Sequence, residues 1–405
     1  MATLQRRIGT LGAAAVGISA MVGSGVFFVW APAAAAAGGW LLLGLVIAAS
    51  VATLNALSTA QLAMAYPRSG GVYTFATHTV HPLAGFVAGW LFLTGKVASA
   101  GASALIAGLY LWPAAAKPLA VAVVIVLALV NASGIRSTVV VSAAITTTVI
   151  AGILVTLGLG LGSTGASAFD VSAFPGPGVL QAASLIFFGF AGYARIATLS
   201  EEVVAPRRTI PRAVVIALVT TFALYAAVAT MCLVVLGPVA LAQSGAPLAD
   251  LVAGPWRAVV PVLAAVAALG SLLGVLAGLS RTGLAMGRGG DLPAAFTRVA
   301  ERTSTPVVAE AAFAVVIVAV VILLEPLALV GFSACAVLGY YALAHLAAFR
   351  QPAGDRWLPR AIQVLGMAGC LVLAVTVPWQ ALVATVALLA VAVALRTAVR
   401  RRRET

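Results

Sequence analysis

The stretch Val22-Gly23-Ser24-Gly25-Val26-Phe27 places two glycines inside an apolar run that extends from about Ile8 to Ala37. Each glycine costs a helix roughly 1 kcal/mol relative to alanine, so two glycines one residue apart favour local unwinding. Unwound backbone within a membrane is tolerated only where it is buried in protein or lines a wet cavity. The alternative is a close helix–helix contact, for which small residues are also suited.

A second stretch of the same kind is Phe187-Phe188-Gly189-Phe190-Ala191-Gly192-Tyr193, again within an apolar run. Broken helices in corresponding positions of two halves of a chain are typical of a transporter's binding site. Because each stretch opens a block of five apolar runs, the two together favour unwinding over simple packing.

The composition excludes a soluble domain. Hydrophobic residues make up 63% of the 405 residues and charged residues only 8%, which is typical of a polytopic membrane protein. The net charge of +13 comes from arginines in short loops between apolar runs. That distribution is typical of membrane topology rather than of a nucleic-acid-binding face.

Twelve apolar runs approach the roughly 20 residues that a membrane-spanning helix needs. We therefore expect an all-α polytopic protein with about twelve spans. The runs are 8–36, 39–65, 82–112, 119–133, 138–162, 178–203, 211–237, 257–286, 307–324, 327–349, 359–376 and 379–396.

Lysine and arginine counts orient the chain. With the N-terminus in the cytoplasm, nineteen arginines fall inside, while only Lys117 and Arg257 fall outside and Lys96 and Arg195 lie within spans. We expect a multi-pass protein of the cell (inner) membrane with both termini cytoplasmic.

The whole chain, 1–405, forms a single membrane domain in this interpretation, with two blocks of five spans, 8–162 and 178–349. Because five is odd, the second block enters the membrane from the opposite side, which predicts an inverted repeat. Two extra helices follow within 359–396, and 397–405 forms a basic cytoplasmic tail.

Several motifs resemble the amino acid–polyamine–organocation superfamily, which has a LeuT-like fold. The first glycine stretch resembles the family's G-[SA]-G-[IV]-F, and 187–193 resembles its F-F-x-F-x-G-[FY]. Residues 200–213 resemble E-E-V-x-x-P-x-R-x-I-P-R-A, 66–73 match Y-P-x-x-G-G-x-Y, and 286–293 resemble M-A-R-D-G-x-L-P. The resemblance covers the first ten spans and implies a secondary active transporter (permease) of amino acids that works by alternating access.

The chain departs from the family pattern at three places. Ala194 and Arg195 stand where the family has an acidic residue, and the fifth span carries Thr148 and Val149 where some proton-coupled members have a lysine. Lys96 in the third span is the only lysine within a predicted span. The chain therefore lacks two of the residues on which the family's usual coupling scheme depends.

An amino acid zwitterion needs partners of both signs, and broken helices supply them from the backbone. N–H groups around Ser24 and Gly25 begin a half-helix and suit the carboxylate, while glycines allow the backbone to approach a ligand closely. Free carbonyls of the two stretches can accept from the ammonium, and Phe190 resembles the family's aromatic gate, with a plain core aromatic as the alternative. The expected substrate-binding residues are Ser19, Met21, Gly23, Ser24, Gly25, Phe188, Gly189, Phe190 and Ala191.

The coupling ion is left open between H⁺ and Na⁺. The resemblance to the LeuT-like fold implies a cation site beside the first and third spans, with carbonyls such as those of Ser19 and Val22, and Ser271 from the eighth span, as candidate sodium ligands. We hypothesise instead that the ammonium of Lys96 stands in for sodium and that its protonation changes during the cycle. The alternative is a static lysine held by helix carbonyls, because a lysine at this depth must snorkel, pair or lose its proton.

The ten carboxylates all lie outside the membrane interior or near its boundaries. A cationic side chain buried in the site would want a carboxylate partner, so we expect neutral amino acids as substrates. Glu201 and Glu202 are expected to form a salt bridge with Arg207 or Arg212, and His345 a hydrogen-bonded helix contact rather than a proton relay.

Other function classes find less support in the residues. We expect no catalytic residues, metal site or cofactor, because the three histidines are scattered and no carboxylate pair lies within the membrane. The expected partners are a small amino acid, the lipid bilayer and a coupling ion, with no nucleic acid. A transporter of another small amine or carboxylate, or a non-transporting sensor on the same fold, remains the alternative.

Overall fold

The computed structural model is helical throughout the residues that it describes, which are 8–66, 70–133, 138–162, 174–193, 195–196, 203–300, 303 and 305–404. The only β-type pairing among them is an isolated bridge between Ile8 and Val203. The helices are α1 (Thr10–Met21), α2 (Gly25–Phe28), α3 (Trp30–Ala37), η1 (Gly38–Trp40), α4 (Leu41–Ala65), α5 (Val72–Thr79), α6 (Pro82–Leu111), η2 (Pro113–Ala115), α7 (Ala116–Ala132), α8 (Thr138–Leu161), α9 (Pro177–Phe190), α11 (Pro206–Gln243), α12 (Pro247–Asp250), α13 (Trp256–Arg288), η3 (Ala294–Thr297), α14 (Val307–Leu323), α15 (Pro326–Phe349), η4 (Ala353–Asp355), α16 (Arg360–Thr376) and α17 (Trp379–Glu404).

Eight helical stretches in the described part of the chain are long and apolar enough to cross a membrane. Four shorter apolar helices accompany them, namely α1, α9, α14 and α16. Side chains such as Val239, Val315 and Leu323 are 70% or more exposed, which a polytopic membrane protein tolerates because lipid covers them. The prediction of an all-helical polytopic membrane protein is confirmed.

The first predicted run, 8–36, is not one helix. It consists of α1, an interruption at residues 22–24, and then α2 and α3, which continue into each other through Val29 in helical conformation. Within the sixth predicted run, 178–203, helix α9 ends at Phe190 and residues 191–193 form a turn. Both interruptions lie where the glycine stretches predict them.

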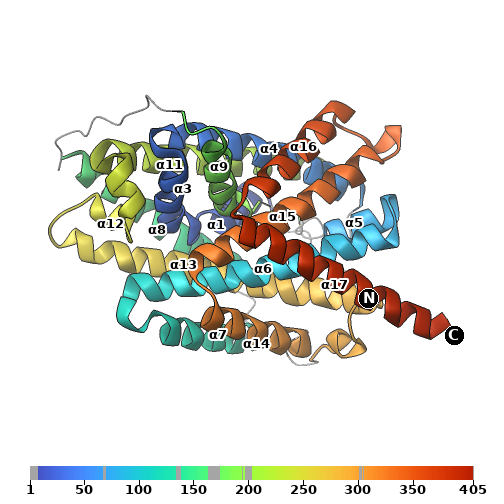
Figure 1. The fold of residues 1–405 in the computed structure, drawn as a ribbon. Helices are drawn as coiled ribbons and strands as arrows, with labels where there is room; N and C mark the ends of the chain where they lie inside the picture. Colours follow the sequence, from blue (N-terminus) through green and yellow to red (C-terminus); the bar gives the residue numbers. More distant parts are fainter. Residues whose placement is uncertain are drawn as a thin grey trace.

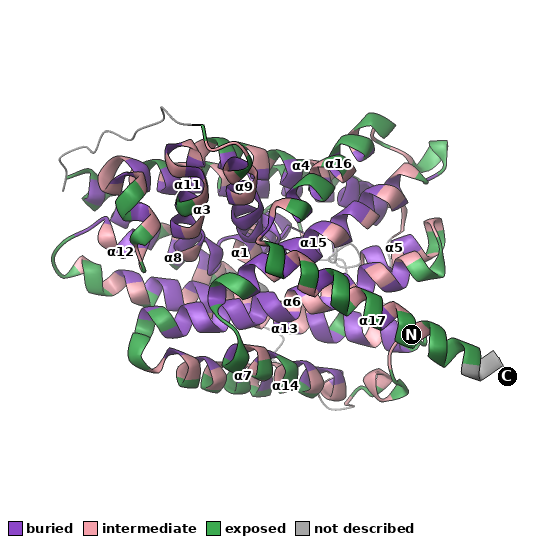
Figure 2. Ribbon diagram, viewed as in Figure 1, coloured by how far each residue is buried: buried purple, intermediate pink, exposed green. Residues whose placement is uncertain are grey.

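The helices form a thick bundle around a buried centre. In Figure 1, α6 and α13 run side by side through the middle, α7 and α14 form a second pair beside them, and α17 crosses the outside. Figure 2 shows burial concentrated on α6, α15, α9 and α1, whereas α7, α14 and α17 have exposed outward faces. The two interrupted helices therefore lie inside the bundle.

The contacts between helices recur in the two halves. Helix α4 contacts α9 as α11 contacts α1 and α3, and α8 contacts α13 as α15 contacts α6. In the same way, α8 contacts α1 and α15 contacts α9. The last helix, α17, continues through Glu404, so the described residues of the predicted basic tail extend this helix.

Candidate substrate site at two broken helices

The first interruption exposes both ends of a helix. Helix α1 ends at Met21, Val22 leaves the helical region with ψ of 68°, and Gly23 donates its N–H to the Met21 carbonyl at 2.9 Å. Helix α2 restarts at Gly25 after Ser24. Because the first N–H groups of a helix have no acceptor within it, the N–H groups beside Ser24 and Gly25 are available to a ligand.

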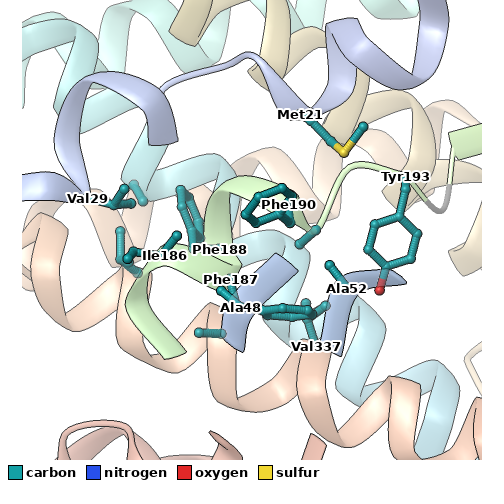
Figure 3. Close-up of a cluster of buried hydrophobic side chains, with 14 of the residues drawn as sticks. Met21, Val29, Ala48, Ala52, Ile186, Phe187, Phe188, Phe190, Tyr193 and Val337 are labelled. Atoms are coloured by element: carbon teal, nitrogen blue, oxygen red, sulfur yellow. The ribbon is translucent and has the colours of Figure 1, made fainter. Parts of the chain in front are cut away.

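The second interruption follows Phe190. The Ala191 N–H lies 3.4 Å from the Phe188 carbonyl and the Tyr193 N–H lies 3.5 Å from that of Phe190. These distances are long for N–H···O bonds, so the carbonyls at this end are weakly satisfied. Figure 3 shows the break beside a cluster of buried side chains that includes Met21, Phe188 and Phe190.

The two interruptions touch backbone to backbone. A Cβ on Gly25 would lie 2.9 Å from Cα of Gly189, and a Cβ on Gly192 would lie 2.7 Å from the Met21 nitrogen and closer still to the Ala20 carbonyl. Only glycine fits at these contacts. The close-contact interpretation and the unwinding interpretation of the glycines are thus both realised.

A cavity of about 30 Å³ lies where the interruptions meet. That volume is about one water's share of liquid, so the space where the interruptions meet is smaller than an amino acid. The lining residues are Ala20, Met21, Gly23, Ser24, Gly25, Lys96, Ser99, Phe188, Gly189, Ala191, Gly192, Ser271 and Val275.

Nine of the twelve predicted binding and coupling residues line this cavity. Ser19, Val22 and Phe190 do not. The Phe190 ring is fully buried and lies 5.0 Å from the ring of Tyr225, so it packs against α11.

Two residues that the sequence reasoning missed hold the first interruption in place. The Tyr225 hydroxyl of α11 donates to the Met21 carbonyl at 2.8 Å, and the hydroxyls of Ser24 and Ser103 lie 2.9 Å apart. Both contacts join residues far apart in the chain, and no local motif marks them. Ser103 lies seven residues, about two helical turns, after Lys96 on α6 and so shares a helix face with it, which is the one signal that could have suggested it.

Two cations lie close to the cavity. Lys96 of α6 donates from Nζ to the Ala191 carbonyl at 3.2 Å, and Arg195 donates from its guanidinium to the Gly274 carbonyl of α13. No carboxylate is among the described residues that line the cavity. The Lys96 ammonium therefore donates to the Ala191 carbonyl, which is one of those predicted to accept from a substrate ammonium.

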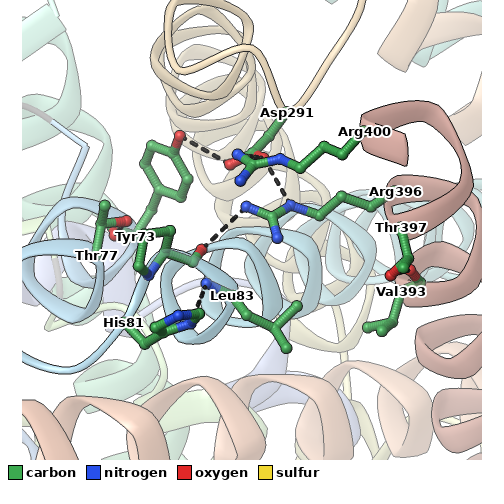
Figure 4. A network of polar contacts seen from close by, with 10 residues as sticks. Tyr73, Thr77, His81, Leu83, Asp291, Val393, Arg396, Thr397 and Arg400 are labelled. Atoms are coloured by element: carbon green, nitrogen blue, oxygen red, sulfur yellow. Dashed lines mark hydrogen bonds and ion pairs between the residues drawn. The ribbon is translucent and has the colours of Figure 1, made fainter. Parts of the chain in front are cut away.

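A polar network ties α17 to the loop after α13, as Figure 4 shows. Oδ1 of Asp291 accepts from Arg396 Nε at 2.7 Å and from Arg400 at 3.3 Å, and Oδ2 accepts from the Tyr73 hydroxyl at 3.1 Å. Burial, and then the Asp291 carboxylate, raises the pKa of the Tyr73 hydroxyl, so Tyr73 remains a donor. Arg396 also donates to the Pro82 carbonyl at 3.2 Å.

The expected helix contact of His345 is present. Its Nε2 lies 2.7 Å from Oδ1 of Asn55 on α4, and the amide oxygen can only accept, so the ring donates. Glu201 and Glu202 lie outside the described residues, as does Ala194.

Comparison with known proteins places this geometry in a family. A family model described as amino acid permease matches residues 8–399. An uncharacterised transporter of Mycobacterium tuberculosis is 45% identical over 96% of this chain and 90% of its own length. The chloroplastic cationic amino acid transporter 9 of Arabidopsis thaliana is 29% identical over 73% of this chain and 58% of its own length. A branched-chain amino acid permease of Bacillus subtilis is 26% identical over 76% of this chain and 72% of its own length. The match across nearly the whole chain, together with the two broken helices, shows that this protein belongs to the amino acid permease family.

Proposed function

We propose that this protein is a secondary active transporter of neutral amino acids and that its substrate binds where the two interruptions meet. The observation that carries the proposal is the shared cavity, which is lined by the backbone ends of two broken helices and by no described carboxylate. The relatives' names include both cationic and branched-chain amino acids, so the choice between them rests on the site.

Each end of a zwitterion has a partner in this geometry. The carboxylate would accept from the N–H groups at the start of α2, which continues through α3 and presents the positive end of a helix dipole. The ammonium would donate to carbonyls of the second interruption, including that of Ala191. A second positive charge on the substrate would lie near Lys96 and Arg195 with no described carboxylate to compensate it.

Transport requires the site to widen, because the cavity of about 30 Å³ is smaller than any amino acid. In our proposal α1–α3 and α9 move relative to α6 and α13, and the cavity opens alternately to the two sides of the membrane. The paired contacts of the two halves support a 5+5 inverted repeat with twelve spans. Two points support cytoplasmic termini: the arginine distribution, and the position of α12 at the far end of the bundle from α5 and the C-terminal end of α17 (Figure 1).

The coupling proposal concerns Lys96. Its ammonium bridges α6 to the second interruption through the Ala191 carbonyl, so loss of its proton would weaken that contact and let the substrate ammonium compete for the carbonyl. We propose that a proton on Lys96 is exchanged during the cycle and that sodium is not required.

Competition in proteoliposomes tests the substrate class. We expect neutral amino acids to inhibit uptake of a labelled neutral amino acid more strongly than lysine or arginine do. A ranking that places lysine or arginine first would contradict the proposal.

A further inference from the structure

An apolar groove of about 500 Å³ runs along the outside of the bundle between α4 and α11. Val46, Thr53 and Leu57 of α4 line one wall. Val215 and Val219 of α11 line the other and are 51% and 63% exposed. The groove therefore opens on the surface that faces the hydrocarbon of the bilayer.

The same two helices border a basic pocket of about 470 Å³ at one end. Arg207, Arg208 and Arg212 from the first two turns of α11 line it, together with Arg356 from the loop before α16. It also lies at the N-terminal end of α11, where the helix dipole adds positive charge. The pocket is thus built for an anion.

The groove and the pocket lie on one continuous face of α11. Arg208 and Arg212 are followed at helical spacing by Val215 and Val219, and residues three or four apart share a face. On α4 the groove runs from Val46 to Leu57, about 16 Å at 1.5 Å per residue. That length is close to half of the roughly 30 Å hydrocarbon core, which is the depth of one leaflet.

The positive charge of the pocket lacks a matching negative charge in the described part of the chain. None of its four arginines forms an ion pair there, and Asp355 is the one described carboxylate in the lining. Nε of Arg356 is buried without a hydrogen-bond partner. Trp357 beside it is 51% exposed, as expected of a tryptophan at the membrane interface.

We propose that this groove and pocket bind one anionic phospholipid of the cytoplasmic leaflet, with an acyl chain along α4 and α11 and the phosphate among the arginines. Guanidinium groups bind phosphate oxygens in bidentate geometry, and an apolar groove one leaflet deep beside them fits a phospholipid better than a free anion. The proposal goes beyond the transport function, because it assigns a second ligand at a separate surface.

The groove also reaches the transport site. Phe190, the last residue of α9 before the second interruption, lines the groove and lies 5.0 Å, ring to ring, from Tyr225. Tyr225 in turn donates to the Met21 carbonyl in the first interruption. The inner wall of the groove is therefore shared with a residue adjacent to the second interruption.

The test measures the lipid selectivity of the full-length protein in phosphatidylcholine vesicles. The vesicles contain a trace of either spin-labelled phosphatidylglycerol or spin-labelled phosphatidylcholine, and the fraction of each label held at the protein is compared. The wild type should prefer phosphatidylglycerol to spin-labelled phosphatidylcholine. Each arginine near an anionic headgroup contributes about fivefold in affinity, so the double variant Arg208→Gln/Arg212→Gln should lose about 25-fold of this preference. The matched control Arg298→Gln/Arg350→Gln removes two exposed arginines elsewhere and should keep it.

A second pair of variants tests the apolar groove between α4 and α11, and its control variant guards against an effect of misfolding. Val215→Trp fills the groove and should lower phosphatidylglycerol association, whereas Val316→Trp on the outer face of α14 should not. Equal association of the two lipids with the wild type, or equal preference in the arginine variant and its control, would overturn the proposal. Displacement of phosphatidylglycerol by millimolar inorganic phosphate would also overturn it, because the pocket would then serve a free anion.

Discussion

The contact between the two interruptions makes Gly192 the most sensitive position in the site. In Gly192→Ala the new Cβ would lie less than 2.7 Å from the Ala20 carbonyl, whereas ordinary contact begins at 3.4 Å. Both neighbouring atoms belong to the backbone and cannot rotate away, so the two interruptions must separate. Overpacking of this kind costs about 1–3 kcal/mol, and we expect the upper end of that range.

The same displacement weakens substrate binding. A lost hydrogen bond to a charged group costs about 1.5–3 kcal/mol, which corresponds to about 10- to 150-fold in Kd. We expect Gly192→Ala to lower the thermal unfolding midpoint and to raise the Kd for a neutral amino acid in that range, both measured on purified protein in detergent.

Gly278 provides the matched control for this prediction. It lies within α13, and a Cβ there meets nothing within 4 Å. Gly278→Ala should leave the Kd unchanged and should hold or raise the midpoint, because alanine favours the helix by up to about 1 kcal/mol. If Gly192→Ala behaved like this control, the contact between the interruptions would not be what shapes the site.

Three further predictions concern coupling, the polar network and topology. Lys96→Met should abolish pH-driven uptake in proteoliposomes while substrate exchange continues; unchanged pH dependence would remove Lys96 from the coupling mechanism. Asp291→Asn leaves Arg396 buried without its charge partner and should lower the free energy of unfolding by about 3 kcal/mol, whereas Asp250→Asn, which removes a more exposed ion pair, should cost less than about 1 kcal/mol; similar losses would show that the network is not a buried one. A cysteine at Gly245 should react with an impermeant thiol reagent from outside the cell and one at Gly354 only from the cytoplasm, and the reverse labelling would invert the topology.

Much of the fold could be predicted from the sequence because the bilayer imposes strong constraints. Long apolar runs must be helical in lipid, and glycine pairs within them mark where a helix is weak. Both interruptions followed from this reasoning. Of the predicted residues at the cavity, those of the two glycine stretches followed from it too, whereas Lys96 and Ser271 were expected there from the resemblance to the LeuT-like fold. The helix contact of His345 followed from the need of a buried polar group for a partner.

The remainder of the site depends on tertiary packing that no local pattern encodes. In the sequence Tyr225 is one aromatic residue within a long apolar helix, yet in the structure its hydroxyl donates to the Met21 carbonyl. The resemblance implies Phe190 as an aromatic gate, with a core aromatic as the alternative, and the direction of the ring depends on how α9 packs against α11. The basic pocket combines residues 207–212 with Arg356, about 150 positions apart in the chain, and only the fold brings them together.

The most direct test of the central claim asks whether the site binds both the carboxylate and the ammonium of an amino acid. Purified protein would be reconstituted into proteoliposomes, and uptake of a labelled neutral amino acid such as leucine would be measured. Unlabelled leucine, its methyl ester and N-acetylleucine would each be added as competitors. If the start of α2 binds the carboxylate and the second interruption binds the ammonium, only leucine itself competes among the three compounds. The proteoliposomes should also accumulate the label above the level of liposomes without protein. Equal competition by the methyl ester or the N-acetyl compound would contradict the account, because the two broken helices would then not be recognising a zwitterion.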